Sequence, residues 1–328
     1  MTDKQIAERS GLVFAADVGG THLRVALVDE AGRIQAQRKT ETPKDTDARS
    51  VVRALVEASR ECDRNRGPDA PAISAASIMV PGTINKNNTM VVQVPNLPCL
   101  DSLGLKVILE DELGWPVVLE NDANAAAVGE MWLGAARGYR SVICITLGTG
   151  VGGGIILDGK LWRGADGSAG EIGHTTVEPF GGLKCKCGNN GCLEMFASAT
   201  AIVRMVREWS PFYAESTLHV EELSAEKVFV AGRKGDELAL KVFEQVGKYL
   251  GVALASLINL LGPEMIVIGG GVANGWDLFE SYMREEVAAR VFLPLAERVR
   301  IEPAECGDNA GLLGAARLAL DERLRLTT

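Results

Sequence analysis

The chain has 328 residues, of which 47% are apolar and 23% are charged, and its formal net charge is −9. This length is enough for about two domains, each with a core of its own. The acidic charge argues against nucleic acid and anionic membranes as partners, because the field of the protein would repel both. A phosphate ligand stays compatible with this charge, since backbone N–H groups can bind one locally.

Hydropathy and cysteine content predict a cytoplasmic protein. The first ten residues, MTDKQIAERS, lack the apolar segment of a signal peptide. The longest uncharged stretches, 141–157 and 249–263, are interrupted by glycines or by polar side chains, so neither is expected to span a membrane. Seven cysteines without a secretory signal predict reduced thiols.

The first part of the chain is predicted to begin with a hairpin. Residues 12–28 form a strand, a tight glycine turn and a second strand, and a further hairpin turn follows at 30–32. A helix is expected over 48–64 and a short buried strand over 72–80.

The next elements present two polar residues at the end of a strand. A helix over 103–113 is expected to end at Gly114. The segment PVVLEND then forms a strand that presents Asn121 and Asp122 at its end, and the segment ANAAAVGEMWLG continues as a helix.

The second part of the chain repeats the strand–glycine turn–strand pattern, over 141–157, and Asp158-Gly159 is typical of a type I′ hairpin turn. The remaining elements predicted are a long amphipathic helix over 236–261, a strand running into a glycine loop over 264–275, and helices over 276–290 and 309–324.

The repeated pattern predicts an α/β protein of two related lobes around a cleft. We expect the N-terminal lobe to comprise residues 1–119 together with about 312–328, because the last helix, after about Gly311, can cross back to it. The C-terminal lobe would comprise 120–311 and contain the cysteine-rich loop 174–192.

The first glycine loop, DVGGT, covers Asp17 to Thr21. Two glycines at the tip of a hairpin expose successive N–H groups that can surround a phosphate. Asp17 ends the strand, where its carboxylate could hold Mg²⁺ directly or through water. An ordinary hairpin turn is the alternative interpretation.

The second glycine loop, LGTGVGGG, covers Leu147 to Gly154. It contains a G-x-G-x-x-G pattern, but a strand follows where a dinucleotide fingerprint requires a helix. The chain also lacks a Walker A sequence. Two such loops facing one another would form a clamp for a nucleoside triphosphate, and two structural hairpins are the alternative.

Asp122 lies at the start of a predicted helix, where the helix dipole and N–H groups stabilise its charged form. Phosphoryl transfer asks little of its base beyond orienting the attacking hydroxyl and accepting the proton late. Asp122 fits this role, and Asn121 could hydrogen-bond a neighbouring hydroxyl. A simple helix cap is the alternative, and both interpretations are compatible.

A cluster of metal-binding residue types lies between Gly173 and Glu194. The three cysteines Cys185, Cys187 and Cys192 and the preceding His174 form a closed Cys₃His set, which is typical of structural Zn²⁺. Without a metal this glycine-rich segment would have little to hold its shape. The other four cysteines are expected to be small core residues.

Two glutamates flank the cysteine-rich segment. Glu171 lies three residues before His174 and Glu194 lies two residues after Cys192. A metal would place both carboxylates on one wall, and the second ring nitrogen of His174 could face a ligand. Carboxylates and an imidazole N–H suit a neutral polyhydroxylated ligand such as a sugar. Two solvated surface glutamates are the alternative.

These motifs together resemble the ROK family (repressor, open reading frame, kinase), in particular its bacterial glucokinase branch. The segments DVGGT, ENDANAA, LGTGVGGG, AGEIGHTTV and CKCGNNGCLE stand in the family's order and spacing, and IGGGVANG and GLLGAA match near the end. The resemblance covers the chain from about residue 12 to its C-terminus, and the cysteine segment is highly specific to the family.

The resemblance implies an actin-like ATPase fold of the ribonuclease H-like type. It also implies transfer of the γ-phosphoryl group of ATP to the 6-hydroxyl of a hexose, glucose first, with Mg²⁺ and a structural Zn²⁺ as cofactors. Asp122 would be the base, and His174 would serve the zinc and the sugar together. His22 departs from the pattern, since many members carry lysine there.

The resemblance further implies two sets of ligand-binding residues. The residues implied to bind the sugar are Gly82, Asn96, Asn121, Asp122, Glu171, His174 and Glu194. The residues implied to bind ATP are Asp17, Gly19, Gly20, Thr21, Gly148, Thr149, Gly150, Gly270 and Gly271.

The family leaves other functions open. N-acetylmannosamine and N-acetylglucosamine kinases share every motif quoted above, and the phosphoryl donor could be ATP or polyphosphate.

Sugar-responsive repressors carry an N-terminal helix-turn-helix domain, for which about a dozen residues before the first strand are too few. A non-catalytic sugar-binding module is disfavoured by Asp17, Asp122 and the two glycine loops. A homodimer or homotetramer is expected.

Overall fold

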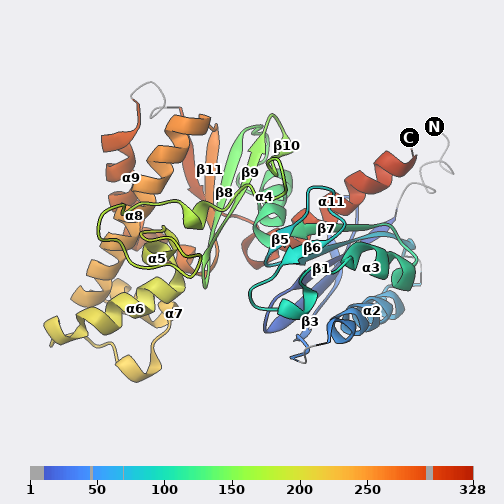
Figure 1. The fold of residues 1–328 in the computed structure, drawn as a ribbon, viewed down its shortest axis with the longest axis horizontal. Helices are drawn as coiled ribbons and strands as arrows, with labels where there is room; N and C mark the ends of the chain where they lie inside the picture. The colour runs from blue at the N-terminus through green and yellow to red at the C-terminus, as the bar shows by residue number, and fades with distance from the viewer. Residues whose placement is uncertain (1–10, 45–46, 69, 293–297, 328) are drawn as a thin grey trace. The chain divides into compact units, whose positions relative to one another are not determined.

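The computed structural model describes residues 11–44, 47–68, 70–292 and 298–327, which fold into two compact units (Figure 1). The first unit takes in the chain up to Gly138, Leu161–Ala169 and the chain from Asp308. The second takes in Tyr139–Lys160 and Gly170–Gly307.

Both units are built on a five-stranded sheet with the same topology. The strand orders are β3-β2-β1-β4-β7 and β10-β9-β8-β11-β12. In each sheet the central strand pairs antiparallel with the strand that follows it and parallel with a later one. The repeated order is what two related α/β halves require, as the sequence predicted.

The strands of the first unit are β1 (Leu12–Val18), β2 (His22–Val28), β3 (Ile34–Glu41), β4 (Ile73–Val80), β5 (Thr83–Ile84), β6 (Val91–Gln93) and β7 (Val117–Asn121). Those of the second are β8 (Val142–Leu147), β9 (Val151–Leu157), β10 (Lys160–Leu161), β11 (Met265–Gly269) and β12 (Arg300–Pro303).

The α-helices are α2 (Ala48–Asn65), α3 (Leu105–Leu113), α4 (Asp122–Leu133), α5 (Glu194–Ala197), α6 (Ala199–Trp209), α7 (Ala225–Arg233), α8 (Glu237–Leu261), α9 (Trp276–Arg290) and α11 (Ala310–Thr327). The 3₁₀ turns are η1 (Pro98–Leu100), η2 (Ile172–His174), η3 (Ser210–Phe212), η4 (Val220–Glu222), η5 (Gly271–Gly275) and η6 (Gly307–Asn309).

The predicted element boundaries follow from local residue chemistry. Gly114 ends α3 with φ +72°, and α8 begins after the N-cap Asp236 and ends at Gly262 with φ +52°. Both residues of the Asp158-Gly159 turn have positive φ, as a type I′ hairpin needs. The short strands β5, β6 and β12 and the helices α5 to α7 had no counterpart in the sequence analysis.

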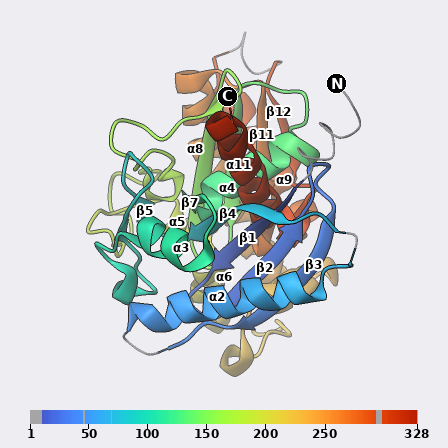
Figure 2. The ribbon, with the colours of Figure 1, turned by 90° about the vertical axis from the view of Figure 1, so that its right-hand side faces the viewer.

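Helices cover both faces of the first sheet. Helices α2 and α3 contribute to one buried apolar cluster with β1, β2 and β4, and Figure 2 shows α2 running across the strands. Helix α11 contacts β1, β4 and α4. Helices α11 and α4 approach so closely that a Cβ at Gly129 or Gly314 would overlap the backbone of the facing helix, so glycine is required at both positions.

The first unit continues past residue 119, the boundary expected from the sequence, because α4 packs against α11. It also takes in 161–169, which the sequence analysis placed in the second lobe. The second unit has its own core, in which α8 contributes the stripe Leu238, Val242, Val246, Leu250, Leu254 and Ile258, all fully buried.

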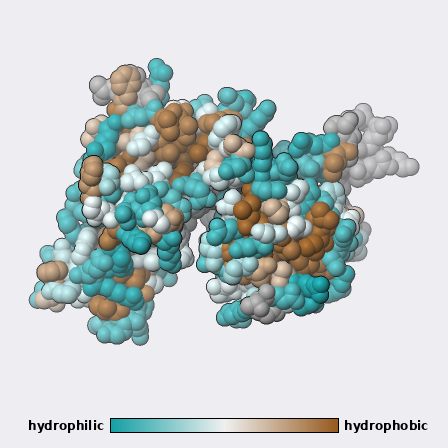
Figure 3. Space-filling view, in the orientation of Figure 1, coloured by the Kyte–Doolittle hydropathy of each residue, from teal (hydrophilic) through white to brown (hydrophobic). Residues whose placement is uncertain are grey.

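The surface of the chain is mixed in character. Figure 3 shows hydrophilic residues over much of the visible face of each unit, with hydrophobic patches between them. Exposed large apolar side chains include Phe180, Phe212 and Leu260. Within the described part of the chain, no helix has both the length and the apolar content that crossing a membrane demands.

Candidate functional site

The first glycine loop is a tight turn held by the residue that follows β3. The N–H of Gly19 donates to the carbonyl of His22, with N···O 3.0 Å. The Thr42 hydroxyl donates to the carbonyl of Gly19 at 2.6 Å, and the Thr42 N–H donates to the carbonyl of Thr21 at 2.9 Å. Thr42 is 2% exposed, and it was not among the predicted site residues.

Asp17 is a part-buried carboxylate at the end of β1. Burial raises its pKa, and the charge of Arg24, its partner across β1 and β2, opposes that rise. A cation would offset the cost of this burial, so the carboxylate fits the proposed role as a Mg²⁺ ligand. A Cβ at Gly20 would stand 3.0 Å from the Cβ of Asn96, which places these two predicted residues side by side.

The start of α4 brings together Gly82, Asn121 and Asp122. Asn121 caps the helix: its side-chain oxygen accepts from the N–H groups of Ala123 and Asn124. Its amide nitrogen donates to the carbonyl of Gly82 at 3.1 Å. The Asp122 Oδ1 accepts from the Ala123 N–H at 2.9 Å. The side-chain oxygen of Asn121 therefore caps the helix. Asn121 was predicted to contact sugar, and the second N–H of its amide is the donor left for a ligand.

The second glycine loop is held by the start of α6 and by β11. The N–H of Gly148 donates to the carbonyl of Gly150, and the Thr200 hydroxyl donates to the carbonyl of Thr149, at 2.9 and 2.8 Å. Gly270 has φ +86°, and a Cβ there would stand 2.5 Å from the carbonyl oxygen of Leu147. Gly270, predicted to lie near the adenosine, therefore adjoins the predicted phosphate loop.

Glu194 joins the second glycine loop to the cysteine-rich segment. Its Oε2 accepts from the N–H of Val151 at 3.0 Å. Its carboxylate lies so close to Gly150 that a Cβ at that position would overlap it. The missing side chain at Gly150 therefore leaves room for this carboxylate beside the loop.

His174, Cys185, Cys187 and Cys192 form a compact cluster. Their ligand atoms all lie within 4.8 Å of one another. The Nδ1 of His174 lies 3.6 Å from the Sγ of Cys185, and the Sγ atoms of Cys187 and Cys192 are 3.7 Å apart. A tetrahedral ion with metal–sulfur bonds of about 2.3 Å has sulfur–sulfur edges of about 3.8 Å, so the cluster fits a Cys₃His metal centre.

The environment of the cluster differs from one thiol to the next. Burial, with hydrogen bonds from the neighbouring thiols, raises the pKa of Cys192 to about 12. A backbone hydrogen bond at Asn189 lowers the pKa of the exposed Cys187. A bound cation would favour the thiolate form of the whole set.

The backbone around the cluster is a folded loop. The N–H of Leu193 donates to the carbonyl of Thr175, and the N–H of Val177 donates to the carbonyl of Gly191, at 2.9 and 2.8 Å. Gly188 and Gly191 have φ +97° and +72°, which lets the chain reverse as the sequence predicted.

Glu171 and His174 are placed by β9. A Cβ at Gly173 would overlap the carbonyl of Val151, so this turn lies directly on the strand. The Nε2 of His174 lies 3.9 Å from a carboxylate oxygen of Glu171. With Nδ1 turned to the cysteines, Nε2 and the carboxylate form one polar face.

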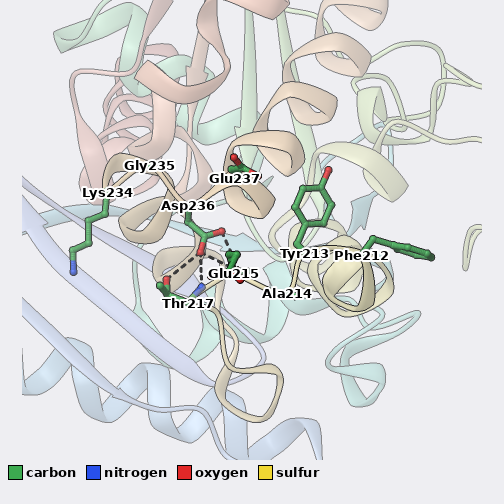
Figure 4. A pocket seen from close by; sticks show the side chains of 10 residues that line it. Phe212, Tyr213, Ala214, Glu215, Thr217, Lys234, Gly235, Asp236 and Glu237 are labelled. Atoms are coloured by element: carbon green, nitrogen blue, oxygen red, sulfur yellow. Dashed lines mark hydrogen bonds between the residues drawn. The ribbon is translucent and has the colours of Figure 1, made fainter.

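A separate cavity of about 510 Å³ lies in the second unit (Figure 4). Asp236 is its buried acid, and it accepts from the Ala239 N–H, the hydroxyls of Ser216 and Thr217, and the Thr217 N–H. These bonds cap α8 and hold the adjoining loop. The lining residues are Phe212, Tyr213, Ala214, Glu215, Ser216, Thr217, Lys234, Gly235, Asp236 and Glu237, and no predicted site residue is among them.

The predicted residues divide between the units. The first unit contains Asp17, Gly19, Gly20, Thr21, Gly82, Asn96, Asn121 and Asp122. The second contains Gly148, Thr149, Gly150, Glu171, His174, Cys185, Cys187, Cys192, Glu194, Gly270 and Gly271.

Three polar residues that bond to the predicted ones were missed: Thr42, Glu120 and Thr200. A fourth, Arg163, bonds to Glu120. Only Glu120 had a local signal that could have found it, because a glutamate in the otherwise apolar strand PVVLEN needs a partner for its charge.

A sheet topology repeated in two units, each with a glycine turn between its first two strands, defines the actin-like ATPase fold. The model of the ROK family matches residues 13–322, and the chain belongs to this family.

Known relatives include an enzyme and a regulator. The chain is 36% identical to a glucokinase of Thermotoga maritima, over 95% of this chain and 98% of that protein. It is 30% identical to a xylose repressor of Caldicellulosiruptor bescii, over 98% of this chain and 81% of the repressor. A crystal structure of a ROK family glucokinase from Streptomyces griseus, in complex with glucose and AMPPNP, is 35% identical with a TM-score of 0.81. That match covers 95% of this chain and 100% of the other.

Proposed function

We propose that the protein is an ATP-dependent hexose kinase that transfers the γ-phosphoryl group of ATP to the 6-hydroxyl of glucose. The observation that carries this proposal is the position of Glu194, which lies against the second glycine loop and two residues from a ligand of the cysteine cluster. The acid proposed to bind sugar is therefore bonded to the loop proposed to bind phosphate. The similarity to glucokinases at 36% identity supports the same assignment.

In this proposal the sugar is bound by groups that accept and donate hydrogen bonds. Glu171 and Glu194 accept from sugar hydroxyls, and the Nε2–H of His174, whose Nδ1 faces the cysteines, donates beside Glu171. Asn121 contributes its second amide N–H, and Gly82 and Asn96 complete the predicted set. Sugar hydroxyls suit these groups because each hydroxyl can donate to a carboxylate oxygen and accept from an N–H.

Asp122 is the proposed base. The 6-hydroxyl oxygen attacks the γ-phosphorus of ATP, the bond from that phosphorus to the β,γ-bridging oxygen breaks, and the hydroxyl proton passes to Asp122. The products are ADP and glucose 6-phosphate. The loose transition state makes orientation of the attacking oxygen the main contribution of this carboxylate.

The phosphates are assigned to the two glycine loops, with Asp17, Gly19, Gly20 and Thr21 in the first. Gly148, Thr149 and Gly150 form the second, with Gly270 and Gly271 toward the adenosine. Bound Mg²⁺ would neutralise phosphate charge, and Asp17 would hold it.

The cysteine cluster is assigned to a structural Zn²⁺. His174 Nδ1 and the three thiolates would hold the ion, which supplies a cross-link and no reaction step. The cross-link keeps the residues on either side of the cluster, Glu171 and Glu194, in place. Reduced thiols are consistent with the predicted cytoplasmic location.

The direct test is a coupled assay with ATP and a series of hexoses. We expect turnover with glucose, and lower kcat/KM with N-acetylmannosamine and N-acetylglucosamine. A higher kcat/KM for an N-acetylated hexose would move the assignment to that kinase. If none of these three hexoses and not mannose either gives a sugar phosphate, the assignment as a hexose kinase is wrong. Polyphosphate in place of ATP tests the donor, and light scattering tests the expected homodimer or homotetramer.

A sugar-responsive repressor is the second candidate, favoured by the 30% identity to a xylose repressor. The acidic charge predicts that the chain does not bind nucleic acid. Salt-sensitive binding of promoter DNA, released by sugar, would support the repressor.

A further inference from the structure

Glu120 is a buried carboxylate beside the proposed base. It is the residue before Asn121 at the end of β7, and it is 1% exposed. Its Oε1 accepts from the backbone N–H of Asn121 and from Nδ2 of Asn124, both at 3.0 Å. One carboxylate oxygen therefore bonds to residues on both sides of Asp122.

Arg163 neutralises this buried charge. Its Nε and Nη2 both donate to Oε2 of Glu120, at 2.8 and 2.6 Å. An ionised carboxylate out of water needs such a partner, because its desolvation is costly. The planar guanidinium supplies two donors in a fixed geometry, which a lysine ammonium cannot reproduce.

Arg163 belongs to a segment that packs in the first unit. Residues 161–169 begin at the last residue of β10, belong to the first unit, and precede Gly170 and Glu171 of the second. Gly167 has φ +102° and lies so close to Ile84 that a Cβ would overlap its carbonyl. Ile84 is two residues from Gly82, whose carbonyl accepts from Asn121. Close packing joins the segment to β5, and the bonds of Arg163 to Glu120 and of Asn121 to Gly82 join both to the start of α4.

We propose that Arg163 is a positioning residue for phosphoryl transfer. Through Glu120 it fixes the turn of Asn121 to Asn124 and thereby the direction of the Asp122 carboxylate. This inference rests on the proposed kinase function. Loss of the guanidinium lowers the rate of the chemical step and leaves the affinity for sugar nearly unchanged, because a displacement of about 1 Å in a reacting group can cost roughly 10²-fold in rate.

The test compares Arg163→Lys and Arg163→Ala with the control Arg66→Lys. Arg66 is in the same unit, its side chain is 27% exposed against 29% for Arg163, and its partner Asp63 is 44% exposed rather than buried. We expect kcat to fall about 10-fold in Arg163→Lys and roughly 10²-fold in Arg163→Ala. The Kd for glucose, from calorimetric titration, should stay within about threefold. The control should keep the kcat of the wild type.

Two further measurements separate positioning from a general loss of stability. Guanidinium ion at tens of millimolar should restore part of the kcat of Arg163→Ala. The kcat of the matched control Arg66→Ala should not respond to guanidinium ion. Glu120→Gln should lower kcat as well, and its combination with Arg163→Lys should lose no more than the larger single loss, because the two residues act as a unit.

Several results would overturn the inference. They are a kcat within twofold of the wild type for both Arg163 variants, additive losses in the double variant, or a loss that follows the folded fraction in thermal unfolding. Each of these leaves an active wild-type kinase, whereas failure of the proposed function itself would appear as a wild-type protein that phosphorylates no hexose.

Discussion

The two glycine loops share a local pattern and differ in what supports them. Each is a turn between antiparallel strands at the start of a five-stranded sheet. The first is bonded by Thr42, which directly follows the third strand of the same sheet. The second is bonded by Glu194 and Thr200, which lie after the cysteine cluster.

This difference predicts that a metal in the cluster affects the two loops unequally. The second loop is connected to the cluster through Glu194, two residues from Cys192, whereas the first loop is bonded within its own unit. In the proposed function, sugar binding should therefore depend on the metal, while the base and the first loop should not. Substitutions in either unit can therefore test this division between the loops.

The first experiment separates the chemical step, assigned to Asp122 in the first unit, from the sugar contacts assigned to Glu171, His174 and Glu194 in the second. Asp122→Asn should lower kcat by about 10²- to 10⁴-fold, because the amide cannot accept the hydroxyl proton. Asparagine can still start the helix, so the Kd for glucose should change little in calorimetric titration. Asp111→Asn, an exposed acid of α3, is the control. Turnover near the wild-type rate would show that Asp122 is not the base.

The second experiment removes the metal. Cys192→Ser should lower the zinc content in elemental analysis and lower kcat/KM for glucose on the order of 10²-fold or more, through KM. The control Cys306→Ser, in the same unit, should retain the zinc content and the kcat/KM for glucose of the wild type. The KM for ATP should change less than the KM for glucose. A protein without bound metal that keeps full activity would contradict the assignment of the cluster.

The third experiment addresses the connection between the cluster and the loop. Glu194→Gln keeps an acceptor for the Val151 N–H and removes the negative charge offered to sugar hydroxyls. Because hydrogen bonds to charged groups contribute about 1.5–3 kcal/mol, the KM for glucose should rise on the order of 10- to 100-fold. Glu226→Gln, on the exposed side of α7, serves as the control. An unchanged KM for glucose would place Glu194 in the loop scaffold alone.

The smallest effect is expected at the support of the first loop. Thr42→Val removes the hydroxyl that donates to Gly19 and should cost about 1 kcal/mol in the free energy of unfolding, measured by denaturant titration. The KM for ATP should rise a few-fold, and the KM for glucose should stay constant. Thr40→Val, on the exposed face of β3, is the comparison. A rise in the KM for glucose alone would contradict the division between the loops.

Much of the fold could be predicted because its signals are local. The helix α9 has the predicted bounds 276–290, and α8 lies between an N-cap aspartate and a glycine in the left-handed region. The helices α5, α6 and α7 were missed because their 4, 11 and 9 residues give only a few turns of a periodic apolar signal. The sequence prediction placed α4 in the C-terminal lobe, whereas the structure places it in the first unit. This boundary could not be predicted because it depends on the packing of α4 against α11, far away in the sequence.

By itself the sequence determined the strand–turn–strand pattern, the helix caps and the set of four candidate metal ligands, because each depends on residue type at short spacing. Only the tertiary structure decided that Arg163 bonds to Glu120, 43 residues earlier, and that Glu194 bonds to Val151, again 43 residues earlier. Nothing in the neighbouring residues states which charged group a buried carboxylate meets. That pairing is made when distant segments pack and water is excluded, so it follows from the whole fold.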